Sequence, residues 1–392
     1  MEILFWISIF IVFYAFLGYG ILLYVMVRLK RLFRGKIEAG EGQTSFYPDV
    51  SLVVPCYNEA DIIREKALNC LALDYNPDKL RIFFITDGST DNFGEVLAEF
   101  PAITLLHEDR RAGKTAAENR AMTVVATPFV IFSDANTLLN KDAIKNIVRH
   151  FRDPKVGCVS GEKRVYTAES DTASAAGEGI YWKYESFLKK LDSDLYSAVG
   201  AAGELVAFRS NLYEVLPEDT ILDDFMQSLL IASKGYKIVY EPDAYAMETG
   251  SASVDEELKR KVRISAGGWQ SMHRLLDKIT PFKQPTLFFQ YLSHRVLRWT
   301  VTPFLLILVF FVNFVLWDSG WVYQAIFVAQ ILFYTAAMMG YMLENRQIRL
   351  KILFVPYYFC VMNYAVIAGL IRFLKGGQKG AWEKAKRKEL RT

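Results

Sequence analysis

Residues 129–137 read FVIFSDANT, an apolar run that stops at Asp134 and is followed two residues later by Asn136. A short, β-branched apolar run bounded by turn residues is typical of a buried strand. In open α/β sheets, ligands bind beyond the carboxyl ends of the strands. The stretch therefore predicts a strand that directs a carboxylate and a carboxamide into a binding site at the edge of a sheet.

Apolar strands and amphipathic helices alternate on both sides of this stretch. Strands are expected at residues 50–57, 80–87, 102–108, 129–134 and 156–161. Helical periodicity lies between them, at residues 59–73, 92–100, 113–125 and 141–151. Continuous Val, Ile and Phe runs that alternate with helices indicate a parallel sheet with both faces covered. The expected fold class of this part is therefore α/β.

The N-terminal region is strongly apolar, since residues 3–27 contain no charged side chain. A helix of about 20 such residues crosses a bilayer. No basic region precedes the run and no small-residue cleavage site follows it, which favours a retained anchor over a signal peptide. Basic residues follow at Arg28, Lys30 and Arg31, so the positive-inside rule places this end in the cytosol.

The chain is expected to divide into an N-terminal transmembrane anchor (1–29), a basic linker (30–48), a cytosolic domain (49–280), an interfacial amphipathic helix (281–299), C-terminal transmembrane segments (300–374) and a basic tail (375–392). The expected location is the plasma (inner) membrane, with several spans. Within the interfacial helix we expect Arg295 to snorkel to the membrane surface. Pro356 and Asn363 suggest that the last apolar segment, 352–371, is bent or re-entrant, and the basic tail favours a cytosolic C-terminus.

Polar groups follow the other expected strands as well. Asp87 ends the second strand and can accept hydrogen bonds from a base or a ribose, although turn chemistry explains it equally well. Lys114 follows a glycine at an expected helix start, where an ammonium and amide groups can meet a phosphate, and a solvated helix start is the alternative. Asp134 and Asn136 offer the oxygen ligands that hard divalent cations prefer, and an Asx turn is the alternative for Asn136.

Two later motifs add charged groups. Residues 200–210, GAAGELVAFRS, allow a ligand to approach the backbone, and they make Gly203 and Glu204 candidate acceptor-binding residues. Asp223 and Asp224 begin an amphipathic helix, and two adjacent acids exceed what a helix cap requires.

Arg260 and Arg263 are one helical turn apart and could neutralise a departing diphosphate; a solvated basic face is the alternative. The four cysteines show no C-x-x-C spacing, which favours a reduced domain without disulfides. The net charge is only +3, and we expect no nucleic-acid partner.

In order and spacing, these motifs resemble those of the membrane-bound family 2 glycosyltransferases with a GT-A fold, which include the cellulose, hyaluronan, chitin and poly-N-acetylglucosamine synthases. The resemblance implies a nucleotide-sugar site that includes Pro55, Tyr57, Glu59, Asp87, Lys114, Asp134, Arg260 and Arg263. It also implies that Asp134 and Asn136, at the D-x-D position, bind Mg²⁺ or Mn²⁺. Asp223 and Asp224 match the E-D of the T-E-D motif, which makes Asp224 the catalytic base.

The chain departs from the family pattern at two places. Asn136 replaces a carboxylate of D-x-D. The Q-x-x-R-W motif reads RKVRI at residues 260–264, so that its Gln and Trp are missing, and Trp269 or Trp182 becomes the candidate platform for the acceptor sugar. Whether transfer is processive or adds one sugar to a lipid-linked acceptor stays open on these residues.

The expected activity is inverting transfer from a nucleotide sugar, a UDP-sugar in the first instance, to a growing polysaccharide or a lipid-linked acceptor. One carboxylate takes a proton from the attacking hydroxyl, and an α-linked donor gives a β-linkage. The alternative from another class is a catalytically silent, nucleotide-binding subunit of a synthase. Asp224 and Arg263 argue against that alternative, whereas Asn136 leaves room for it.

Overall fold

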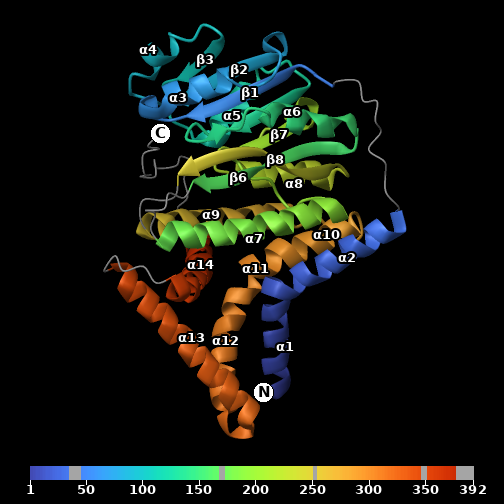
Figure 1. Cartoon of the computed structure of the whole chain (residues 1–392), viewed down its shortest axis with the longest axis vertical. Helices are drawn as coiled ribbons and strands as arrows, with labels where there is room; N and C mark the ends of the chain where they lie inside the picture. The colour runs from blue at the N-terminus through green and yellow to red at the C-terminus, as the bar shows by residue number, and fades with distance from the viewer. Residues whose placement is uncertain (35–45, 167–172, 250–253, 346–350, 377–392) are drawn as a thin grey trace.

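The computed structural model of the chain describes residues 1–34, 46–166, 173–249, 254–345 and 351–376. Figure 1 shows a sheet domain above a set of long helices, with α7 (Ala173–Leu195) and α9 (Val254–Leu275) forming the layer beneath the sheet. Most of the expected basic linker and nearly all of the expected basic tail lie outside the described residues.

The sheet has eight strands in the order β3-β2-β1-β4-β7-β6-β8-β5. They are β1 Val50–Cys56, β2 Leu80–Asp87, β3 Ile103–Glu108, β4 Phe129–Ser133, β5 Leu138–Leu139, β6 Val156–Tyr166, β7 Leu205–Arg209 and β8 Lys237–Thr249. The first four of these in spatial order are parallel, and they contain four of the five strands expected from the sequence. The expected helices are also present, as α3 Ala60–Leu71, α4 Phe93–Leu97, α5 Lys114–Met122 and α6 Ala143–Val148, which is followed by the 3-10 turn η3 Arg149–Arg152.

The sheet is mixed, although the five strands expected from the sequence run parallel to one another. β7 lies between β4 and β6 and is antiparallel to both. Residues 200–210 were expected to form a backbone that a ligand approaches, and not a strand. The apolar run of β7 follows the small residues of GAAGE (200–204), which favour a loop, and its burial between two strands becomes evident only in the assembled sheet.

Helices cover both faces of the parallel half of the sheet, as expected. Leu52 and Val54 of β1 pack into a core with residues of α3 and α6, whereas Val53 packs into a second core with residues of α5 and α8 (Asp223–Ser233). This alternation follows from the two-residue period of a strand. The described cysteines are all free, which confirms the expectation of a domain without disulfides.

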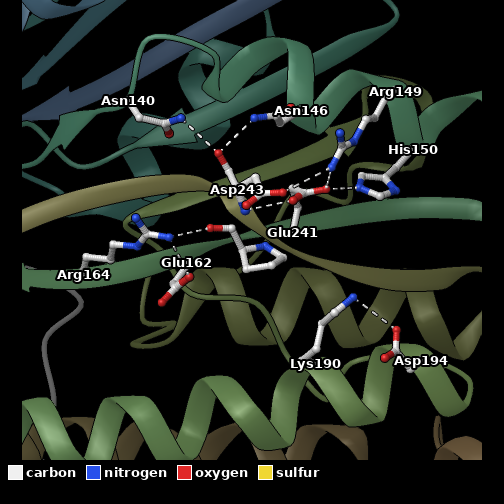
Figure 2. A network of polar contacts seen from close by, with 11 residues as sticks. Asn140, Asn146, Arg149, His150, Glu162, Arg164, Lys190, Asp194, Glu241 and Asp243 are labelled. Atoms are coloured by element: carbon white, nitrogen blue, oxygen red, sulfur yellow. Dashed lines mark hydrogen bonds and ion pairs between the residues drawn. The ribbon is translucent and has the colours of Figure 1, made fainter. Parts of the chain in front are cut away.

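A polar network stabilises the sheet at β8, next to the edge strand β5 (Figure 2). Glu241 of β8 is buried, and its carboxylate pairs with Arg149 and His150 of η3, each at 2.5 Å. Asn140 and Asn146 donate hydrogen bonds to the carbonyl oxygen of Asp243. Although burial by itself would raise the pKa of Glu241, the hydrogen bonds from His150 and Arg149 lower it to about 2.

Replacing Glu241 by Gln is expected to destabilise the domain at neutral pH by about 1.5–3 kcal/mol, because hydrogen bonds to a charged acceptor are lost. A carboxyl with a lowered pKa stabilises the fold above its unfolded pKa and loses this effect as the pH falls, so the deficit should shrink between pH 4.5 and about 2. Thermal unfolding in detergent across this range measures it. Glu214→Gln, which breaks a half-exposed pair with Lys234, is the control and should change little.

Three helices in the described part of the chain are long and apolar enough to cross a membrane, and a bent pair would bring the number to four. The first is the continuous helical run of α1 (Glu2–Phe13), the π-helical turn η1 (Tyr14–Gly18) and α2 (Tyr19–Arg34). The others are α13 (Trp321–Asn345) and α14 (Lys351–Leu374). The bent pair joins the helical stretch Pro285–Trp299 to α12 (Val301–Val315) at an angle of 54°.

Two expectations about the later helices are wrong. α14 is one continuous helix with Pro356 inside it, which contradicts the re-entrant alternative for residues 352–371 but not the bent one. At Gly369 it approaches α9 so closely that a Cβ atom would lie 2.6 Å from the side chain of Ser265. Arg295 does not snorkel, because it is only 6% exposed and pairs with Glu185 of α7 at 2.5 Å. Arg295 belongs to a helical stretch made of α10 (Pro285–Tyr291), η5 (Leu292–Val296) and α11 (Leu297–Trp299). Charged residues of this stretch thus point into the protein interior.

Candidate active site

The carboxyl ends of β1 and β2 are joined by hydrogen bonds, which brings their polar residues together. The amide of Asn58 donates to Ser89 Oγ at 3.1 Å, and the amide of Thr90 donates to Asn58 Oδ1 at 2.8 Å. Pro55 is buried at the end of β1, and Glu59 occupies the position before α3. The expected nucleotide-contacting residues of β1 therefore lie beside the loop that follows β2.

Asp87 anchors the loop before α5. It is 1% exposed, and its carboxylate accepts hydrogen bonds from the backbone amides of Ala112 at 3.1 Å and Gly113 at 2.6 Å. In the same loop, the Arg111 guanidinium lies 3.6 Å from the centre of the Tyr57 ring. Gly88 has a φ of +67°, and a Cβ there would lie 2.6 Å from Arg111 Cβ, so this close approach requires glycine. Asp87 thereby fixes the backbone from which Lys114 extends.

Lys114 contacts carboxylates from three separate parts of the chain. Its Nζ donates to Asp134 Oδ1 at 2.7 Å and lies 3.6 Å from Asp223 Oδ2 and 3.8 Å from Glu118 Oε1. Burial would lower the pKa of Lys114, but Asp134, Asp223 and Glu118 together hold it well above its usual range. We call Lys114, Asp134, Asp223 and Glu118 the lysine–carboxylate cluster.

Asp224 adjoins this cluster. A Cβ atom on Gly203 would lie 3.1 Å from Lys114 Nζ and 3.2 Å from Asp224 Oδ2, so the glycine backbone runs close to both groups. Burial and the neighbouring Asp223 raise the pKa of Asp224 to about 7, although Lys114 acts in the opposite direction. A carboxylate with a pKa near neutrality is suited to accept a proton in a reaction at physiological pH.

The residues at the end of β4 fit a divalent cation bound together with a substrate. Asp134 directly follows the strand and belongs to the lysine–carboxylate cluster, and Asn136 lies in the turn two residues later. No group of three His, Cys, Asp or Glu side chains among the described residues could hold a metal by itself. Mg²⁺ commonly binds to one or two carboxylates plus substrate phosphates. The excess of carboxylates over ammonium around Lys114 favours such an added cation.

A cavity of about 600 Å³ extends from Asp224 toward the apolar helices. Its lining comes from the β7 loop, α7, α8, α9, the helical stretch Leu292–Trp299, η1 and α14. Glu204 lines it and forms an ion pair with Lys163 at 2.8 Å. Arg260 also lines it and pairs with Glu257 at 2.9 Å. The cavity thus gives an acceptor a route to Asp224.

Other residues singled out from the sequence have different surroundings. Arg263 is not among the cavity-lining residues; burial lowers its pKa, and its electrostatic neighbours are Asp223 and Arg372 of α14. Trp269 packs at the edge of the core around α8 and does not line the cavity, whereas Trp182 does. Ile264, at the position of the Trp in Q-x-x-R-W, lines the cavity as well.

Several charged residues of this region were not predicted from the sequence. Glu118 belongs to the lysine–carboxylate cluster, and Lys189, Arg295 and Arg298 line the cavity. In the sequence, Glu118 and Lys189 read as ordinary charged positions of amphipathic helices, and no local spacing separates them from solvated side chains. Only the packing of α7 against its neighbours shows that Lys189 is buried.

Comparisons with known proteins identify similar families and folds. A family model described as Glycosyl transferase family 2 matches residues 51–216. The chain is 30% identical over 237 residues to the poly-beta-1,6-N-acetyl-D-glucosamine synthase of Staphylococcus aureus, covering 57% of this chain and 56% of the relative. It is 25% identical over 265 residues to the synthase of the same name from Staphylococcus epidermidis, covering 65% and 62%. The aligned region therefore spans somewhat more than half the length of these relatives.

A solved structure shares the fold across nearly the whole chain. It is a mannosyltransferase from Pyrobaculum calidifontis in complex with GDP-Man and Mn²⁺, with a TM-score of 0.72 and 23% identity, over 96% of this chain and 100% of that one. The similarity extends beyond the sheet domain to the apolar helices, because the overlap includes almost all residues. Residues 51–216 therefore match the glycosyltransferase family 2 model, and the chain has a GT-A fold accompanied by apolar helices in its N- and C-terminal regions.

Proposed function

We propose that the chain is an inverting membrane glycosyltransferase that moves a sugar from a nucleotide sugar, a UDP-sugar in the first instance, to a hydroxyl of a polysaccharide or lipid-linked acceptor. The observation that carries the proposal is the position of Asp224, which borders the lysine–carboxylate cluster on one side and lines the cavity on the other. A single carboxylate can therefore meet both a donor and an acceptor.

Asp224 acts as the general base in this proposal. The acceptor hydroxyl enters from the cavity, gives its proton to Asp224 and attacks the anomeric carbon as the diphosphate leaves from the opposite face. This in-line displacement inverts the configuration, so an α-linked donor gives a β-linkage. The leaving diphosphate needs no protonation, which is why one carboxylate is sufficient.

The donor side is assigned to the ends of β1, β2 and β4. We assign the nucleotide to Tyr57 and to the loop before α5 that Asp87 anchors, and Lys114 holds Asp134 in place by its hydrogen bond of 2.7 Å. Asp134 and Asn136 would hold Mg²⁺ or Mn²⁺, which supplies positive charge to the diphosphate when bound. Arg263 stays a candidate for the same task through its proximity to Asp223.

The membrane position is assigned from the apolar helices and the charges beside them. The N-terminal run Glu2–Phe33 is long and apolar enough to span, and it carries its basic residues at the end nearer the sheet domain. The positive-inside rule then places the sheet domain in the cytosol, at the inner face of the plasma membrane. Arg31 and Lys30 support this arrangement through contacts with α7, where Arg31 pairs with Asp194 at 2.7 Å.

The test is a screen of the full chain, purified in detergent, against labelled UDP- and GDP-sugars with and without Mg²⁺ or Mn²⁺. Release of a nucleoside diphosphate from one donor, stimulated by the cation and accompanied by transfer of the label, is the expected result. Binding of a nucleotide without turnover of any donor would instead support the catalytically silent subunit.

The pH dependence of transfer tests Asp224 directly. The rate at low donor concentration should rise with pH and reach half its plateau near pH 7, because only the ionised carboxylate accepts a proton. In Asp223→Asn the profile should move to lower pH, since the neighbouring negative charge that raises the pKa of Asp224 is gone. Initial rates from pH 5 to 9 measure both, and a flat profile would remove Asp224 from this role.

A further inference from the structure

Lys189 is a buried cation whose partner is absent from the described protein. It lies on α7, is 4% exposed and lines the cavity. Its ammonium lies 5.9 Å from the ring centres of both Trp182 and Tyr240, but it forms no hydrogen bond and no ion pair with any described residue. Lysine is almost never fully buried without a partner, because the desolvation of a lone charge is unfavourable. An anion that enters the cavity would relieve this penalty.

The cavity wall around Lys189 carries an excess of positive charge. Arg295 and Arg298 line it as well, and both depend on the same carboxylate, that of Glu185, at 2.5 Å and 3.4 Å. The described lining as a whole carries more cations, Lys189, Arg260, Lys261, Arg295 and Arg298, than acids, which are Glu185, Glu204 and Asp224. Arg295 is held further by a hydrogen bond from its Nε to the carbonyl oxygen of Val199, so the guanidinium is fixed in position. Fixed guanidiniums and an ammonium together are suited to a phosphate group.

The other end of the cavity is apolar and reaches the lipid-facing helices. Phe16 of η1 and Phe359 of α14 line it and touch each other, with their ring centres 4.9 Å apart. The Arg298 guanidinium lies 5.9 Å from the centre of the Phe16 ring, where the charged wall meets the apolar end. Leu17 and Val355 line the cavity and are also 56% and 53% exposed, so its margin opens on the outer surface between η1 and α14.

We propose that the cavity binds an acceptor lipid in which a phosphate joins a long hydrocarbon chain to the sugar-bearing headgroup. The phosphate pairs with Lys189, Arg295 and Arg298, and the hydrocarbon chain leaves between η1 and α14 into the bilayer. The headgroup hydroxyl extends to Asp224, a step that rests on the proposed function. A neutral glycan in the same cavity would leave the ammonium of Lys189 without a directly paired anion, since the carboxylate of Glu185 already pairs with Arg295 and Arg298. The phosphate-linked acceptor is therefore favoured.

The experiment compares three probes on the purified full chain in detergent: a long-chain isoprenoid phosphate, the corresponding isoprenol and inorganic phosphate. The proposal expects saturable binding of the isoprenoid phosphate only. In Lys189→Met this binding should weaken at least about 30-fold, because a buried charge pair loses one member. The melting temperature of the ligand-free variant should at the same time rise by roughly 2–4 °C, because an uncompensated buried charge is removed.

The control is Lys190→Met, the same substitution at the next residue of α7. Lys190 is exposed, is not among the cavity-lining residues and pairs with Asp194 at 3.2 Å (Figure 2), so both binding and melting temperature should stay at wild-type values. Equal binding of isoprenol, equal binding of inorganic phosphate, or unchanged binding by Lys189→Met would each overturn the proposal. A fall in the melting temperature of Lys189→Met with unchanged binding would show that the ammonium has only a structural role.

Failure of this inference can be told apart from failure of the proposed function. Release of nucleoside diphosphate from a donor in the presence of water depends on the donor side and on Asp224, and it needs no lipid. If donor turnover is found without binding of the isoprenoid phosphate, the acceptor assignment fails alone. If the isoprenoid phosphate binds through Lys189 but no donor is turned over, the cavity assignment holds and the proposed function fails.

Discussion

Replacing Asp224 by Asn is expected to reduce sugar transfer by at least about 100-fold, the usual contribution of a positioned general base. The amide has nearly the same shape as the carboxylate but cannot accept the proton of the attacking hydroxyl. Folding should be preserved, because loss of a carboxylate whose pKa is raised by burial removes an unfavourable charge from the site. Donor binding should also persist, since Lys114 and Asp134 are unchanged.

The measurement is the rate of labelled sugar transfer, with nucleotide binding determined in parallel. Asp219→Asn serves as the matched control: it is the same substitution a few residues upstream, at an exposed carboxylate that pairs with Arg274 at 2.7 Å. It should leave transfer unchanged. If Asp224→Asn transferred sugar at a rate close to that of the wild type, the proton would have to go to another group, of which Asp223 is the nearest candidate.

Replacing Lys114 by Met is expected to destabilise the protein by about 3–5 kcal/mol at neutral pH, the typical result of removing one member of a buried ion pair. Asp134 and Asp223 would then lie close together in the site without their shared cation. The deficit should shrink as acidification protonates these carboxylates. It should also shrink on addition of Mg²⁺ or Mn²⁺ if Asp134 belongs to a cation site.

The same variant separates two roles for Lys114. Because Lys114 lowers the pKa of Asp224, its removal should shift the pH profile of transfer upward from pH 7. A lysine that only contacts a donor phosphate would raise KM for the donor while leaving the profile and the melting temperature unchanged. Lys114→Arg, which retains the charge, should recover most of the stability but not the full rate. Melting temperatures and kcat/KM from pH 5 to 9 distinguish these outcomes.

The parallel half of the sheet was predictable because its signals are local. A run such as FVIFS in β4 is apolar, of strand length and bounded by polar residues, and β1, β2 and β3 repeat this pattern between amphipathic helices. The placement of Asp134 followed from the same pattern, because parallel strands end at the same edge of the sheet. β7 was missed because its short apolar run follows the small residues of GAAGE (200–204), which favour a loop.

The candidate site was predicted one residue at a time but not as an arrangement. Asp134 and Asp223 were predicted as functional acids, and Lys114 as a phosphate ligand. The structure instead pairs Lys114 with both acids, which lie about 20 and about 109 positions after it in the chain. Such contacts depend on how β4, α5 and α8 pack. For the same reason Trp269 was a candidate platform for the acceptor sugar, because it lies close to residues 260–264 in the sequence. In the structure it packs at the edge of the core and does not line the cavity.

The sequence by itself determined the apolar helices, the α/β character of the domain and the identity of the acids at the strand ends, because hydrophobic period, strand composition and motif spacing are properties of neighbouring residues. Only the tertiary structure decided that Lys114 is shared by several carboxylates, that Arg295 turns inward to Glu185 and that Lys189 faces a cavity without a partner. Burial and charge pairing depend on groups brought together from distant segments, and the free energy of a charge is set by those neighbours.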